Sequence, residues 1–248
     1  IAGKKLNDED KDFLVLPLDV TKFDTHDQAV QTVLEHFGQI DILVNNSGRS
    51  QRGLIINTEF KVDQELFELN VLGTISLTKV VLPHMIERHA GHIVVVSSLT
   101  GKLGVPTSGT YSATKHALQG YFYSLRTEVY DNGIDVSIVC PGPVKSAIVE
   151  NSVSEKFGKS AKDTPYGKED MSRRMETDQF VKYMAIAMVN KLDECWISPQ
   201  PGLWVVYASQ YIPSIFTWLY KRYGLRHMKK LRHNEGKVPD MSWHENVS

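Results

Sequence analysis

Short apolar runs alternate with amphipathic stretches along most of the chain. The runs with the length and composition of buried strands are Phe13–Asp19, Ile40–Val44, Ile93–Ser97, Val136–Cys140, and a last strand that starts at Trp196 and resumes over Leu203–Val206. Solid apolar runs separated by helical stretches are typical of a parallel sheet that is covered on both faces. The pattern therefore predicts an α/β fold with a doubly wound, Rossmann-like parallel sheet in a single domain.

The stretches between these runs carry apolar residues at helical spacing. We expect helices over residues 25–37, 63–88, 110–130 and 180–192, with a kink or break at Pro83 in the second of them. Residues 151–178 are polar and charged with little periodicity, so we expect a functional loop or lid there.

Composition narrows the classes of function. The 248 residues are 42% hydrophobic and 23% charged, which favours a soluble globular fold over disorder. The 28 basic and 29 acidic residues give a net charge of −1 and no electrostatic reason to expect a nucleic-acid partner. Two cysteines cannot build a disulfide framework, and the histidines show no metal-ligand spacing, so no metal site is predicted.

The residues that follow the predicted strands are the candidates for a ligand site. Asp19, Asn45, Ser98 and Pro141-Gly142 each come directly after an apolar run. In doubly wound sheets ligands bind at the carboxyl ends of the strands. We therefore expect these residues to lie at one edge of the sheet and to form the functional site.

A tyrosine and a lysine one helical turn apart offer acid–base chemistry. Tyr111 and Lys115 share one face of the predicted helix. A phenol with a pKa of about 10 needs a shift of ~3 units, or ~4 kcal/mol, to titrate near neutrality, and a nearby ammonium favours the phenolate. Such pairs also occur by chance on helix surfaces. The Ser98 hydroxyl strengthens the pair, because it can hold a carbonyl oxygen beside the phenol. Asn70, polar within an apolar helical stretch, is either a satisfied buried amide or a relay that holds water near Lys115.

These residues, in this order and spacing, resemble the short-chain dehydrogenase/reductase family from Phe13 to Val206. Asn45-Asn46-Ser47-Gly48 resembles the family's N-N-A-G turn, and Pro141-Gly142-Pro143-Val144 resembles its P-G turn. Asn70, Ser98, Tyr111 and Lys115 fall where the family's catalytic tetrad falls. The narrower similarity is to the membrane-associated branch that handles steroids and retinoids.

The resemblance implies hydride transfer between NADP, or alternatively NAD, and the carbonyl or alcohol of a hydrophobic substrate. Tyr111 would exchange the proton, and Ser98 would bind the substrate oxygen. Lys115 would hold the nicotinamide ribose and lower the pKa of Tyr111, while Asn70 would position a water. Cofactor contacts are implied for Asp19, Val20, Asn45, Tyr111, Lys115 and Val144. The resemblance also implies the endoplasmic reticulum membrane, on either its cytoplasmic or its lumenal face.

The family's glycine-rich turn is not found. No G-x-x-x-G-x-G or G-x-G-x-x-G pattern stands between a strand and a helix. We therefore expect an N-terminally truncated sheet that begins with the third strand and lacks the first βαβ unit. With strands ~4.8 Å apart, this leaves a gap of roughly 10 to 15 Å between Phe13–Asp19 and Ile40–Val44. The chain alone would then have no proper pyrophosphate site.

The C-terminal residues form a second region. We place the Rossmann-like domain at residues 1–206 and a hydrophobic and basic tail at 207–248. Residues 203–220 carry no charge and basic residues follow, but Ser209, Gln210 and Pro213 argue against a membrane span. We expect a helix on a membrane surface, with packing on the domain or on a homodimer partner as the alternative.

Two other functions stay open beside the oxidoreductase. The first is a truncated, inactive isoform or fragment that acts by binding a partner. The second is a sugar-nucleotide epimerase, which also uses a Tyr/Lys pair. An epimerase needs a sizeable substrate domain after the sheet, and only about 40 residues follow Val206.

Overall fold

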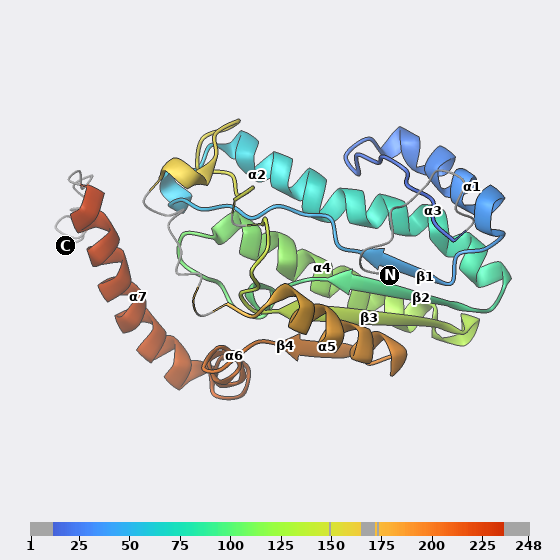
Figure 1. Cartoon of the computed structure of the whole chain (residues 1–248). Helices are drawn as coiled ribbons and strands as arrows, with labels where there is room; N and C mark the ends of the chain where they lie inside the picture. Colours follow the sequence, from blue (N-terminus) through green and yellow to red (C-terminus); the bar gives the residue numbers. More distant parts are fainter. Residues whose placement is uncertain (1–11, 149, 165–171, 173, 236–248) are drawn as a thin grey trace, which may run out of the picture.

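Four parallel strands form the centre of the molecule (Figure 1). The computed structural model describes residues 12–148, 150–164, 172 and 174–235. The strands pair in the order β1-β2-β3-β4, with bounds Ile42–Asn45, Gly91–Val96, Ile134–Pro141 and Glu194–Ile197. Val44 pairs with Val94, and Val139 pairs with Cys195. Because all strands run in the same direction, their carboxyl ends share one edge of the sheet.

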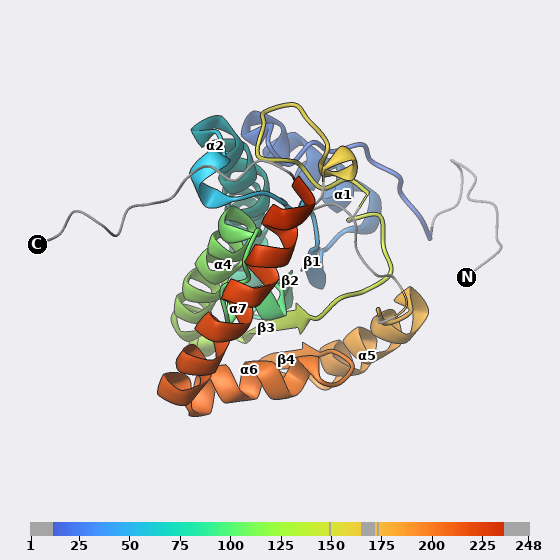
Figure 2. The same cartoon turned by 90° about the vertical axis from the view of Figure 1, so that its left-hand side faces the viewer.

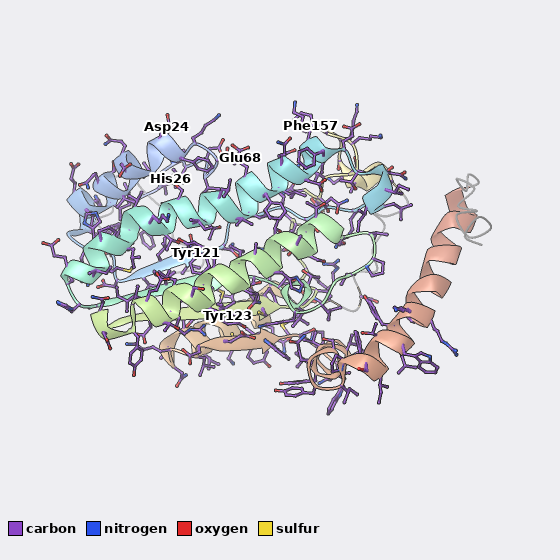
Figure 3. All side chains as sticks on the ribbon, turned by 180° about the vertical axis from the view of Figure 1, so that it is seen from behind. Asp24, His26, Glu68, Tyr121, Tyr123 and Phe157 are labelled. Atoms are coloured by element: carbon purple, nitrogen blue, oxygen red, sulfur yellow. The ribbon has the colours of Figure 1, made fainter. Side chains whose placement is uncertain are left out.

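Helices cover both faces of this sheet. Their bounds are α1 His26–Phe37, α2 Phe60–Phe67, α3 Gly73–Glu87, α4 Gly109–Glu128, α5 Thr177–Val189, α6 Gly202–Tyr211 and α7 Pro213–Glu235. A π-helical turn, Glu68–Leu72, joins α2 to α3. In Figure 1, α5 lies in front of the sheet, and in Figure 3, seen from behind, α3 and α4 lie across its other face. The predicted single-domain, Rossmann-like α/β fold is confirmed.

The main core lies between the sheet and helices α1, α3 and α4. Met85, Leu118 and Phe122 from the helices meet Ile93 and Ile138 from β2 and β3, and all five are essentially inaccessible to solvent. Each such side chain contributes ~1.5–3 kcal/mol by leaving water. This packing holds α4 against β2 and β3, and α4 carries two of the predicted site residues.

The other face of the sheet is covered over β3 and β4 and open over β1. Val94, Val139 and Phe180 form a smaller core with α5. The side chains of Ile42 and Val44 on β1 are 48% and 41% exposed on that side. Within the described residues, the outer edge of β1 pairs with no strand. The sheet therefore leaves an apolar surface at its β1 side.

The prediction of a strand over Phe13–Asp19 is wrong. The segment forms no strand, and Val15 and Leu16 are exposed. A strand needs hydrogen bonds to a neighbouring strand, and the doubly wound order places two strands between this segment and β1. No described residues supply those two strands, so the apolar run has nothing to pair with.

The expectation that the last strand resumes over residues 203–206 also needs correction, and the helix does not break at Pro83. Residues 203–206, expected to resume the last strand, lie in α6, where Val206 packs into the main core and Trp204 is 67% exposed. The long helix after residue 60 changes geometry at the π turn around Asn70, while Pro83 lies inside α3. Val206 is the only buried residue of α6, whereas a strand inside a covered sheet would bury most of residues 203–206.

The helix α7 lies beside the domain (Figures 1 and 2). The Tyr220 hydroxyl donates a hydrogen bond to the Gly104 carbonyl at 3.1 Å, and the Gln210 amide donates to the Lys102 carbonyl at 2.8 Å. Both contacts reach the loop that precedes α4. The predicted domain boundary after residue 206 falls inside α6 and stays a prediction.

Candidate active site

Ser98 lies at the carboxyl edge of the sheet, just past β2. Its hydroxyl accepts a hydrogen bond from the Thr100 amide at 3.1 Å and so caps the short helical turn that follows. The same hydroxyl lies 3.4 Å from the Pro141 carbonyl at the end of β3. These contacts fix the Ser98 hydroxyl between the ends of two central strands.

Tyr111 and Lys115 meet Ser98 from the first turns of α4. Both residues are buried, and the Ser98 hydroxyl acts on the Tyr111 phenol as a hydrogen-bond donor that lowers its pKa. The Lys115 Nζ donates to the Val96 carbonyl at 2.9 Å and lies 5.7 Å from the centre of the Tyr111 ring. The structure thus brings Ser98, from the end of β2, close to the Tyr111 and Lys115 pair on α4.

Burial works against ionisation of both side chains. It raises the pKa of Tyr111 above its usual value and lowers the pKa of Lys115 to about 8. The hydrogen bond from Ser98 and the positive charge of Arg52 act in the opposite direction on the pKa of Tyr111. Sequence reasoning missed Arg52, because no local pattern marks a loop arginine 59 positions before the tyrosine.

Asn70 clamps the turn that follows β1. Its Oδ1 accepts from the Arg49 amide and its Nδ2 donates to the Arg49 carbonyl, both at 2.9 Å. Nδ2 also donates to the Thr114 hydroxyl at 3.1 Å. A Cβ on Gly48 would lie 3.0 Å from the Asn70 Oδ1, so a side chain at this position would crowd the Asn70 amide. Of the two expectations for Asn70, the satisfied amide describes these contacts; the water relay stays a prediction.

The residues predicted to bind a cofactor lie in two groups. Asn45 and Val144 stand at the carboxyl edge: the Asn45 amide donates to the Thr78 hydroxyl at 2.9 Å, and the Val144 carbonyl accepts from Arg174 at 3.1 Å. Val20 packs instead against Gly73 at the start of α3. Beside it, hydrogen bonds from Thr21 lower the pKa of the exposed Asp19 carboxyl.

The carboxyl edge suits the nicotinamide end of a dinucleotide. It offers the buried amine of Lys115 and the hydroxyl of Ser98, which are hydrogen-bonding groups suited to a ribose and a carboxamide. Within the described residues no glycine-rich turn links a strand to a helix N-terminus, the usual pyrophosphate site. The residues present therefore fit one half of such a cofactor.

The described residues hold no cluster of metal ligands and one long apolar helical stretch. Among residues 12–148, 150–164, 172 and 174–235, no group of three or more His, Cys, Asp or Glu residues is placed to hold a metal ion. In the same part of the chain, one helical stretch, Phe60–Glu87, is long and apolar enough to cross a membrane. Because residues of this stretch pack into the main core, it also meets the description of a core helix in a soluble protein.

Comparison with known proteins settles the family. A family model described as short chain dehydrogenase matches residues 2–156. The chain belongs to the short-chain dehydrogenase family. It is 48% identical over 227 residues to human dehydrogenase/reductase SDR family member 7, and 46% identical over 229 residues to the mouse protein of that name. These alignments cover 91% and 92% of this chain and 66% and 67% of the relatives, so the chain spans about two thirds of their length.

Solved structures agree with this assignment. A short-chain dehydrogenase from Streptomyces avermitilis superposes with a TM-score of 0.68 at 28% identity, covering 86% of this chain and 80% of that one. The structure described as ElxO with NADP bound gives a TM-score of 0.60 at 28% identity, covering 73% and 74% of the two chains. The family is one of oxidoreductases that act on small molecules with a nicotinamide cofactor.

Proposed function

We propose that this protein transfers hydride between NADP and the carbonyl or alcohol of a hydrophobic, steroid- or retinoid-like substrate. The observation that carries the proposal is the buried cluster of Ser98, Tyr111 and Lys115 at the carboxyl edge of the sheet. The NADP-bound relative supports the choice of NADP over NAD. The apolar character of the substrate follows from the similarity to the steroid- and retinoid-handling branch.

Tyr111 and Ser98 act on the substrate oxygen in different ways. Tyr111 gives its proton to the developing alkoxide in reduction and takes it back in oxidation. Ser98 donates a hydrogen bond to the same oxygen, as an oxyanion-hole donor does. A bound nicotinamide supplies or accepts the hydride. With a pKa of about 8, Lys115 is mostly protonated at neutral pH and can hold the ribose hydroxyls.

Other residues hold the cofactor and shape the site. Asn45 and Val144 would line the nicotinamide end, and Asp19 and Val20 the adenine end. Asn70 keeps the Gly48 turn in place and, as proposed, positions a water near Lys115. These assignments follow the resemblance to the family, and the places of Asn45 and Val144 after the ends of β1 and β3 support theirs.

Substitution of the phenol tests the proposal. The full chain is assayed for NADPH oxidation with steroid ketones and retinal, and Tyr111→Phe is expected to lower kcat about 10²–10⁴-fold, since the proton donor is removed. Tyr121→Phe is the control, because Tyr121 lies on the same helix and packs against the main core. Wild-type turnover by Tyr111→Phe would contradict the proton-transfer role, and a preference for NADH would contradict the cofactor assignment.

The open side of the sheet favours a second candidate function. A non-catalytic protein that binds a partner would use exposed apolar surface such as that of Ile42 and Val44. Calorimetric titration of the chain with NADP separates the candidates. Binding with turnover supports the oxidoreductase, whereas absence of both, with the fold intact by circular dichroism, supports the partner-binding protein.

We further propose that α6 and α7 rest on the endoplasmic reticulum membrane. The two helices expose large apolar side chains: Trp204, Tyr211, Ile215, Trp218, Leu219 and Tyr223. Lys221 and Arg222 are exposed beside them, and the Arg222 guanidinium lies 4.3 Å from the centre of the Trp218 ring. Aromatic residues with a basic flank are typical of helices at a lipid interface.

Liposome flotation tests the membrane proposal. Wild type is expected to float with anionic vesicles, and a Trp218→Gln/Leu219→Gln variant to remain at the bottom, because the apolar contact is lost. Thr217→Gln, an exposed neighbour on the same helix, serves as the control. A homodimer in sedimentation analysis that the double variant abolishes, with no flotation by wild type, would assign this surface to a second copy instead.

A further inference from the structure

Arg52 connects three parts of the molecule that surround the candidate active site. One of its guanidinium nitrogens, Nη1, donates to the Ser50 hydroxyl at 2.5 Å, to the Gln51 carbonyl at 3.0 Å and to the Ser108 hydroxyl at 2.9 Å. Its backbone amide donates to the Val153 carbonyl at 2.9 Å. The residue thus joins its own loop to the 150–164 segment and to the start of α4.

The Ser108 contact brings the arginine to the catalytic helix. Ser108 is the residue that precedes α4, and Tyr111 follows three positions later, on the same side of the first turn. The neighbouring Gly53 amide donates to the Thr107 carbonyl at 2.9 Å and fastens the same junction. The Arg52 charge acts on the phenol: it lowers the pKa of Tyr111 against the effect of burial.

Other charged groups surround this junction, from each element packed against it. Lys115 lies beside the Tyr111 ring but donates to the Val96 carbonyl. Asp63 of α2 accepts a hydrogen bond from the Thr110 hydroxyl. Glu155 accepts from the Leu54 amide at 3.3 Å, and Arg174 acts on Arg52 as a like charge.

We propose that Arg52 is a positioning residue of this site, whose guanidinium holds the start of α4 and presents a positive charge to the Tyr111 hydroxyl. The inference rests on the proposed role of Tyr111 as the proton donor. Lys115 donates to the Val96 carbonyl and then acts mainly on the ribose. Arg52 supplies part of the lowering of the Tyr111 pKa that the sequence analysis attributed to Lys115 alone. Loss of a cation that acts on a buried phenol is expected to change the ionisation constant of that phenol about tenfold.

Direct titration of Tyr111 tests the proposal without requiring turnover. The full chain is labelled with [13Cζ]tyrosine, the Tyr111 signal is assigned from Tyr111→Phe, and its titration midpoint is followed by NMR. Arg52→Gln is expected to raise the midpoint by about one pH unit, since the charge is lost. Arg52→Lys is expected to stay near the wild-type midpoint. Arg49→Gln, which removes an arginine of the same loop that pairs with Glu65 at 3.1 Å, should leave it unchanged.

The outcomes separate this inference from the proposed function. An unchanged midpoint in Arg52→Gln, or an equal shift in Arg52→Lys, overturns the electrostatic role of Arg52. If Arg52→Gln does not fold, Ser108→Ala replaces it: the midpoint should rise because the guanidinium loses its contact with α4, and no change overturns the proposal. Turnover by Tyr111→Phe would instead overturn the proposed function, whatever the midpoints are.

Discussion

The buried amine of Lys115 should make this protein less stable at neutral pH than a neutral side chain would. Folding lowers the pKa of Lys115 from 10.5 to about 8, because burial disfavours the charged form. Each pKa unit corresponds to ~1.4 kcal/mol, so protonation of the buried amine costs about 3 kcal/mol of folding free energy at pH 7. Above pH 10.5 the amine is neutral in both states and the cost disappears.

Lys115→Met isolates this effect. Methionine has a similar length and no charge, but it leaves the Val96 carbonyl without the donor that lies at 2.9 Å. An unsatisfied buried carbonyl costs ~1–3 kcal/mol. At pH 7 the variant is therefore expected to be more stable than wild type by about 1 kcal/mol, and above pH 10.5 it is expected to be less stable by about 2 kcal/mol. The sign of the difference reverses because, between pH 8 and 10.5, the unfolded wild-type chain keeps a proton on Lys115 that the folded protein has lost, so wild type gains stability as the pH rises.

Urea unfolding followed by circular dichroism measures the difference. Free energies of unfolding of wild type and Lys115→Met are compared between pH 7 and 10.5, where wild type should gain about 3 kcal/mol relative to the variant. The comparison cancels titrations common to both proteins. A difference that does not change with pH would refute the reasoning, because it would mean that the Lys115 pKa is the same in the folded and unfolded states.

Three further substitutions test the packing around the site. Phe122→Ala should lower the free energy of unfolding by about 3–5 kcal/mol, since the side chain is fully buried, whereas Tyr130→Ala at a 78% exposed position should change it little; urea midpoints check both. Gly142→Ala would place a Cβ 2.1 Å from the Ser198 Oγ and should lower the melting temperature, which Gly142→Ala/Ser198→Gly should partly restore. Asn70→Leu removes both hydrogen bonds to the Arg49 backbone and should lower stability by about 1–3 kcal/mol, with a wild-type melting curve as the contradicting result.

The sequence predicted best the elements that can be recognised from the pattern of their own apolar residues. β2 and β3 are runs of apolar residues, and α4 carries its apolar residues at helical spacing. Their bounds differ from the expected ones by a few residues at most. Phe13–Asp19 has the same apolar composition but forms no strand, because strand formation also requires a partner, and a partner cannot be read from the run itself.

The polar residues of the site also differ in this way: some could be placed from the local sequence, and others depend on contacts with distant residues. Ser98 could be placed at the carboxyl edge from the sequence because it follows a strand, whereas its meeting with Tyr111 and Lys115 was implied by the resemblance to the family. The contacts of Asn70 could not, since its main partner is the backbone of Arg49, 21 positions earlier. Arg52 was missed for a similar reason: its partner Ser108 lies 56 positions away, and the contact exists only once the loop folds onto α4.

Burial explains why the site needs more than the Tyr/Lys pair. The environment that brings Tyr111 and Lys115 together raises the pKa of the phenol and lowers that of the amine, so it opposes the phenolate twice. The amine also donates to the Val96 carbonyl rather than to the phenol. An acidic phenol here must therefore draw on the Ser98 hydrogen bond and on a second cation held at the start of α4. Arg52 is placed to be that cation, and its position depends on the loop that Asn70 clamps.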